Sequence, residues 1–96
     1  MNIPDSALHP RGAFRVRVSR HAQARYLYRV CSGVHDVRAA IKAMWFQSCP
    51  ATDLDLECAG AQREEGAVYR VGRGPDGLRC VMVARENVIL TILRMR

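Results

Sequence analysis

The apolar and polar positions change their period along the chain. In residues 14–19, FRVRVS, apolar residues alternate with arginine, and this period of two predicts a half-buried strand. Over residues 20–31 the spacing becomes helical, with Ser19 at the expected N-cap position and Gly33 suited to a C-terminal cap. A second helix is predicted over residues 35–47, because its apolar residues recur every three or four positions.

Three strand-like runs follow in the second half of the chain, at residues 67–73, 78–84 and 87–95. A turn signal, GPDG, joins the first two, and a short REN connection joins the last two. The final run is apolar almost throughout, which is typical of a strand inside a sheet. The pattern predicts an α+β domain with a short N-terminal strand, two helices and a three-stranded antiparallel meander, in the order β-α-α-β-β-β.

The length and the irregular stretches predict one domain. A chain of 96 residues can bury one small core. Residues 1–13 contain two prolines and a glycine and follow no period, so we expect a flexible arm ahead of a domain at 14–96. Residues 48–65 are predicted to be an acidic loop. The sequence shows no apolar run typical of a membrane helix or a secretion signal, which favours a cytoplasmic protein with reduced thiols.

The cysteines give no sign of a metal site. Their spacing forms no C-x-x-C pair and no zinc pattern, so we expect neither a metal nor a cofactor. Cys31 and Cys80 stand in apolar patterns and are predicted to be core residues.

Charge narrows the class of partner. The formal net charge is +6, and fourteen of the fifteen cationic residues are arginine, Lys42 being the other. Acidic residues gather at 53–65, between two basic segments, where they are either solvated or shield the basic surface. Arginine binds phosphate and carboxylate through two N–H groups at once. We therefore expect a polyanionic partner, either RNA or an acidic protein surface.

His21, Arg25 and Arg29 recur at four-residue spacing and share one face of the first predicted helix, with Tyr28 beside them. Cleavage of RNA needs a group that takes the proton of the ribose 2′-OH and a fixed charge that stabilises the phosphorane. Histidine and arginine suit these two roles, and neither requires a metal. Arg29 would position the backbone, and Tyr28 would stack on a base or share the proton transfer. The same pattern is also that of a solvated basic helix face, and the residues leave both interpretations open.

Further cations lie on the predicted strands. Arg70 and Arg79 stand on neighbouring strands and are expected to point to one sheet face, with Tyr69 on the other. Arg73 and Arg85 stand at strand ends, where we expect them to contact a phosphate backbone. These four arginines would extend the basic surface of the helix.

Two segments of the chain, VSRHAQARYLYRV and YRVGRGPDGLRCVMVARENVILTILR, resemble small RelE/BrnT-like proteins of a toxin superfamily, in a branch associated with phages and plasmids. The resemblance covers about residues 16–38 and 67–94. It implies an α+β fold with helices packed on a twisted antiparallel sheet. It also implies a metal-independent endoribonuclease of the toxin type, inhibited by a protein antitoxin.

In this resemblance His21 and Arg25 match the helix motif and Arg70 matches the strand motif. The implied roles are general acid or base for His21 and phosphorane stabilisation for the two arginines. The acidic, cysteine-bearing stretch at 48–65 is longer than the family pattern.

A second function belongs to another class. A non-catalytic phage or mobile-element inhibitor, similar in kind to anti-CRISPR proteins, would bind a nucleic-acid-handling host defence complex or nucleic acid itself. In that case charge reversal on the arginines matters and the imidazole of His21 does not. The exposed edge of a small meander also makes a homodimer a partner to consider.

Overall fold

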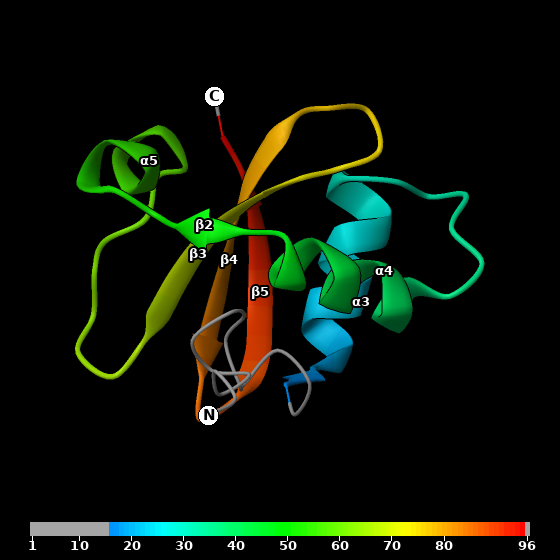
Figure 1. Ribbon diagram of the computed structural model, residues 1–96, viewed down its shortest axis with the longest axis horizontal. Coiled ribbons are helices and arrows are strands. Elements are labelled where there is room, and N and C mark those ends of the chain that lie inside the picture. Colours follow the sequence, from blue (N-terminus) through cyan, green and yellow to red (C-terminus); the bar gives the residue numbers. More distant parts are fainter. Residues whose placement is uncertain (1–15, 96) are drawn as a thin grey trace, which may run out of the picture.

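Five strands form one sheet, and three helices pack on it, in the residues 16–95 that the computed structural model describes (Figure 1). The predicted arm at 1–13 lies outside the described residues. The strand order across the sheet is β1-β5-β4-β3-β2, so β5 lies inside the sheet, as its apolar sequence predicts. The elements are β1 (Arg17–Val18), α3 (Arg20–Arg29), α4 (Val37–Phe46), β2 (Cys49–Pro50), α5 (Asp53–Cys58), β3 (Val68–Arg73), β4 (Arg79–Arg85) and β5 (Val88–Arg94).

The sheet is mixed because its first strand runs parallel to its last. β1 pairs with β5, Arg17 opposite Val88, whereas all other neighbouring strands are antiparallel. The predicted meander of β3, β4 and β5 is therefore confirmed, and β1 and β2 extend it at its two edges. Between β4 and β5, Glu86 and Asn87 have φ angles of 50° and 64°. Two consecutive positive φ angles are the conformation that a tight two-residue hairpin requires.

Alternate residues of β4 supply two separate cores. Cys80, Met82 and Ala84 face α3 and α4, and Val81 faces α5 on the other side of the sheet. The larger core consists of Val16, Ala22, Tyr26, Ile41, Met44, Trp45, Cys80, Met82, Ala84, Ile89 and Ile92. The smaller core consists of Ala51, Leu56, Tyr69 and Val81. Each face of the sheet is therefore partly covered by helices. Because side chains alternate along a strand, the position of each strand arginine determines the face on which it lies.

The N-terminus of α3 lies where the sequence predicts it. The Ser19 hydroxyl accepts a hydrogen bond from Ala22 N at 3.0 Å, so Ser19 is the N-cap of α3 as predicted. The C-terminus was predicted wrongly, because α3 ends at Arg29 with Val30 as its C-cap and Gly33 lies beyond it. Among residues 16–95, no helix is long and apolar enough to cross a membrane.

Residues 48–65 are not one irregular loop. They contain β2 and the short helix α5, so the observed order is β-α-α-β-α-β-β-β. α5 starts in a capping box, in which the Thr52 hydroxyl accepts from Asp55 N and an Asp55 carboxylate oxygen accepts from Thr52 N. Leu56 then anchors the helix in the smaller core. The acidic composition of the segment concealed this helix in the sequence.

The edge of β5 beyond β1 is capped by α3 and the residue before it. β1 pairs with only two residues of β5, so later carbonyl groups of β5 lack a strand beside them. The Ser19 hydroxyl donates to Leu90 O at 3.1 Å, and the Arg29 guanidinium donates to Ile92 O at 2.9 Å. These two side chains satisfy backbone acceptors that would otherwise form an open sheet edge.

Candidate functional site

The exposed surface of α3 brings His21 and Arg25 into contact. The buried residues of α3 are Ala22 and Tyr26, whereas His21 is exposed and Arg25 is half-buried. Arg25 Nε lies 3.4 Å from His21 Nε2 and donates to it, which assigns the lone pair of the imidazole to Nε2 and its proton to Nδ1. α3 contains no acidic residue that would neutralise this pair. We call this contact the His21–Arg25 pair.

Tyr28 lies on the same side of α3 but further along its axis. Its side chain is 84% exposed, which leaves the ring free to stack. Tyr28 is seven positions after His21, which places it about 10 Å away along the helix axis. That distance suits contact with a neighbouring nucleotide rather than with the phosphate at the His21–Arg25 pair.

Arg29 stands on the predicted stripe but takes part in the fold. Its guanidinium donates to Ile92 O, and its own carbonyl accepts from Arg94 Nη1 at 2.7 Å. The four-residue spacing therefore aligns three cationic or titratable side chains, while the tertiary structure leaves only two of them available to a ligand.

Arg70 lies on the face of the sheet that α3 and α4 cover. Its Nε and Nη2 atoms donate to Ser48 Oγ and Ser48 O, each at 2.6 Å, and its Cζ lies 5.8 Å from the ring centroid of Trp45. The guanidinium is engaged at the C-terminal end of α4 and makes no bond to the His21–Arg25 pair in the described part of the chain. The structure thus does not bring the three predicted catalytic side chains together.

The prediction that Arg70 and Arg79 share a sheet face is wrong. Arg70 is paired with Met82, and Arg79 is paired with Arg73, so the two arginines lie on opposite faces. Arg79 shares its face with Tyr69 and α5 instead.

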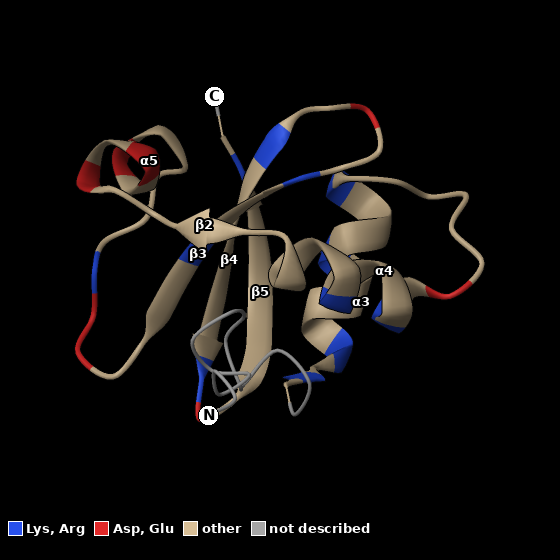
Figure 2. Ribbon diagram, viewed as in Figure 1, with Lys and Arg blue, Asp and Glu red and all other residues tan. Residues whose placement is uncertain are grey.

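The acidic segment neutralises two of the strand arginines. Arg79 Nη2 lies 2.6 Å from Asp55 Oδ1, and Arg85 Nη2 lies 3.0 Å from Glu64 Oε2. In Figure 2 the acidic positions of α5 (red ribbon) and the basic positions of α3 (blue ribbon) lie at opposite sides of the view. The acidic segment therefore shields arginines of the sheet and not those of the helix.

Asp55 is the carboxylate that the sequence interpretation missed. It is 8% exposed and ionised, because the backbone N–H and the hydroxyl of Thr52, with the Arg79 guanidinium, lower its pKa against the opposing effect of burial. The spacing T-x-x-D at 52–55 is a capping-box pattern, and it could have revealed both the helix and the fixed position of this carboxylate.

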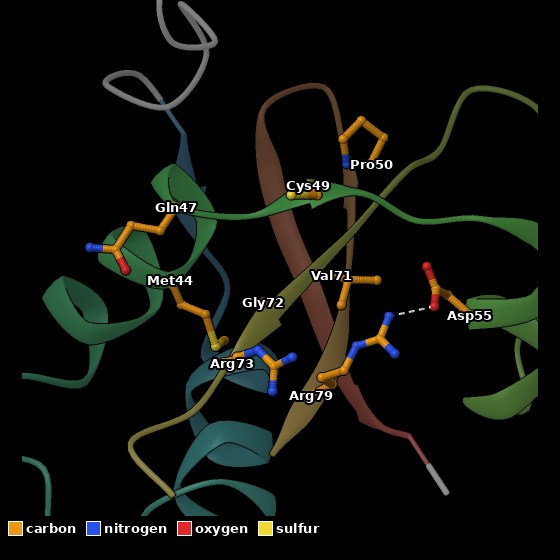
Figure 3. Close-up of a pocket in the computed structure, with 9 residues that line it drawn as sticks. All are labelled: Met44, Gln47, Cys49, Pro50, Asp55, Val71, Gly72, Arg73 and Arg79. Carbon is orange, nitrogen blue, oxygen red and sulfur yellow. Dashed lines mark hydrogen bonds and ion pairs between the residues drawn. The ribbon is translucent and has the colours of Figure 1, made fainter. Parts of the chain in front are cut away.

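A pocket of about 380 Å³ opens beside the edge of β3, next to the N-terminal end of β2 (Figure 3). It lies between the C-terminal end of α4, β2, and the paired ends of β3 and β4. Its lining residues are Met44, Gln47, Cys49, Pro50, Asp55, Val71, Gly72, Arg73 and Arg79. Of the predicted site residues, only Arg73 and Arg79 contribute to this pocket.

The four cysteines are free thiols, with Cys49 exposed and Cys80 buried, as predicted for Cys80. Burial raises the pKa of the Cys80 thiol to about 11, and its Sγ contacts Met44 Sδ at 3.5 Å. Cys31 is half-buried against the larger core. In residues 16–95, no group of three or more His, Cys, Asp or Glu side chains is placed to hold a metal ion.

No family model, no curated protein and no solved structure matches this chain. The likeness of its two motifs to RelE/BrnT-like proteins therefore stays an expectation from the sequence, and the roles of the site residues are argued from their geometry.

Proposed function

We propose that the protein cleaves RNA without a metal ion at the His21–Arg25 pair. The observation that carries the proposal is an exposed imidazole whose Nε2 lone pair faces a guanidinium 3.4 Å away. A proton acceptor and a fixed positive charge thus stand within reach of one phosphodiester. The surrounding helix surface is basic and attracts a polyanion.

The chemistry follows from the two side chains. His21 Nε2 takes the proton of the ribose 2′-OH, and the 2′-oxygen attacks the adjacent phosphorus. Arg25 turns from the imidazole to the phosphate and stabilises the charge of the phosphorane. The bond from phosphorus to the 5′-oxygen breaks, the leaving oxygen takes a proton from water, and a 2′,3′-cyclic phosphate remains. His21 then releases its proton to solvent, which returns the pair to its starting state.

Tyr28 contributes to binding in this proposal. Its exposed ring offers a stacking surface for the base of a neighbouring nucleotide, at the far end of the same helix face. Arg70 and Arg29 act through the fold, because their guanidiniums are bonded to Ser48 and to Ile92 O.

The test is cleavage of a fluorescent single-stranded RNA in the presence of EDTA. Wild type should produce fragments that end in a 2′,3′-cyclic phosphate. His21→Ala should lower the rate by about 10²-fold or more, and Arg25→Ala by a similar factor. His35→Ala and Arg38→Ala are matched controls, since both residues are exposed and lie outside α3. Undiminished cleavage by His21→Ala would remove the imidazole from the mechanism.

A second candidate function is nucleic-acid binding without cleavage. It is favoured by the engagement of Arg29 and Arg70 in the fold, which leaves Arg25 as the one of these three predicted site arginines that contacts the imidazole. Under this alternative wild type leaves the RNA intact but binds it with an affinity that falls steeply with salt. His21→Ala should then bind as wild type does, whereas Arg25→Ala should reduce the slope of log K against log salt by about one.

A further inference from the structure

The pocket beside β3 holds a second group of cations that RNA cleavage on α3 does not use. Arg73 and Arg79 stand directly opposite each other on β3 and β4. Like charges in such a cross-strand pair destabilise a sheet unless something compensates them. Asp55 compensates only one, through its 2.6 Å contact with Arg79, so the group keeps one surplus positive charge.

The Arg73 guanidinium and backbone N–H have hydrogen-bond donors available at the pocket. Within the described residues, its guanidinium makes one hydrogen bond, from Nη1 to Gly77 O at 2.9 Å, and a guanidinium has five N–H groups. Its backbone N–H also points to the open edge, because β2 begins only at Cys49, opposite Val71, and the direction of the peptide groups repeats every second residue. Figure 3 shows the Arg73 and Arg79 side chains next to each other below Gly72 and Val71, with Asp55 reached from Arg79.

The rest of the pocket is suited to an organic group. Met44, Pro50 and Val71 supply apolar surface, and Gln47 adds a side-chain amide. A volume of about 380 Å³ lies within the range of roughly 300–1,000 Å³ that is usual for small-molecule sites. A bare inorganic anion would leave most of this space unfilled.

We propose that this pocket binds a phosphate monoester, either of a free nucleotide or of an RNA end, with Arg73 and Arg79 holding the phosphate and Met44, Pro50 and Val71 contacting the attached group. Three terminal oxygens of a phosphate can accept from both guanidiniums and from the Arg73 backbone N–H, whereas a carboxylate has only two oxygens to share among them. The phosphate also supplies the negative charge that the cross-strand pair lacks.

Cys49 provides a direct readout, because it is exposed and lines the pocket. Its alkylation by iodoacetamide can be followed by peptide mass spectrometry, with half-buried Cys31 as the reference thiol in the same molecule. Adenosine 5′-monophosphate should slow alkylation of Cys49 and leave that of Cys31 unchanged, while adenosine should protect neither. A short RNA with a 5′-phosphate, compared with the same RNA bearing a 5′-hydroxyl, distinguishes an RNA end from a free nucleotide as the source.

Arg73→Ala is the informative variant, since the exposed Arg73 side chain bonds, among residues 16–95, only to a backbone carbonyl. It should raise the nucleotide concentration for half-protection by about tenfold or more. Arg38→Ala makes the same charge change on α4 and should leave that concentration unchanged. Arg79→Ala is less suitable because it deprives Asp55 of its partner, so Arg79→Lys serves as the second variant and should weaken protection while keeping the charge.

Several results would overturn the proposal. They are a lack of protection by the nucleotide in wild type, equal protection by adenosine, and an equal effect of Arg38→Ala and Arg73→Ala. Equal protection by a nucleoside that carries a carboxylate in place of the phosphate would overturn the phosphate assignment. Because protection is read without RNA cleavage, the result stands whether or not His21 acts on RNA.

Discussion

Replacing Arg70 by methionine keeps an unbranched side chain beside Trp45 and removes the guanidinium. The variant loses two hydrogen bonds to Ser48, each 2.6 Å long, and the placement of a cation 5.8 Å from the indole centroid. Ser48 is 9% exposed, so its carbonyl oxygen has limited access to water once the partner is gone. The perturbation therefore falls on the junction between α4, β2 and β3 rather than on the α3 surface.

The expected magnitude follows from these contacts. A hydrogen bond that involves a charged group is worth about 1.5–3 kcal/mol, and a cation over an aromatic ring near the surface about 0.5–1 kcal/mol. Arg70 is half-buried, so solvent reduces each contribution, and the contacts share one guanidinium and do not add fully. We expect a loss of about 2–3 kcal/mol in the free energy of unfolding. For a domain of this size, that loss lowers Tm by about 10–20 °C.

Circular dichroism during thermal unfolding measures the effect, and RNA cleavage per folded molecule at 15 °C separates stability from chemistry. Arg38→Met is the matched control, because Arg38 is exposed on α4, and its effect should stay within about 0.5 kcal/mol. A Tm for Arg70→Met within 2 °C of wild type, together with lost cleavage, would refute the reasoning and return Arg70 to the catalytic machinery.

Three further predictions concern other parts of the molecule. The pKa of Asp55 is lowered in the folded state, so its carboxylate stabilises the fold above a pH of about 4 and loses that effect as the pH falls through the folded value. Asp55→Asn should therefore be less stable than wild type in urea at pH 7, and the difference should shrink as the pH falls below about 4; a difference that does not shrink on acidification would contradict this. In the native protein iodoacetamide should modify Cys49 and spare Cys80, whose pKa is raised to about 11, until denaturant is added; modification at equal rates argues against the buried thiol. Gly72→Ala places a Cβ 2.5 Å from an α4 side-chain carbon and should cost about 1–3 kcal/mol by thermal unfolding, whereas Gly33→Ala has nothing within 4 Å and serves as control; equal Tm values for the two variants would show that the α4 side chain yields freely.

The elements that the sequence predicts well are those with local causes. The Ser19 cap, the helical spacing of α3 and α4, and the tight turn at 86–87 each depend on a few neighbouring residues. The parallel pairing of β1 with β5 joins residues that lie far apart in the sequence, such as Arg17 and Val88, and no local pattern predicts it. The acidic composition of α5 is typical of an exposed loop, and the capping box at 52–55 is the one local signal that indicates a helix there.

In the candidate site, too, contacts with a local cause could be predicted and those set by the tertiary structure could not. The contact between His21 and Arg25 follows from their spacing on one helix. The sheet face on which Arg79 lies does not follow from its spacing in the sequence, because it depends on the number of residues in the turn between β3 and β4. Arg73 pairs with Arg79, so the turn is one residue longer than the GPDG pattern suggests. A shift of one residue in register exchanges the two faces of a strand, which separated Arg79 from Arg70.

The pairing of β1 and α3 with β5 has a consequence for the order of folding during synthesis. The Ser19 hydroxyl reaches the carbonyl of Leu90, 71 positions later in the chain. α3 is therefore synthesised before β5, the strand that receives it. Its apolar face, with Ala22 and Tyr26, must stay uncovered or be sheltered by a chaperone until then. Contacts of such long range also slow folding, and the larger core can be completed only after β5, the last of the described strands, has been made.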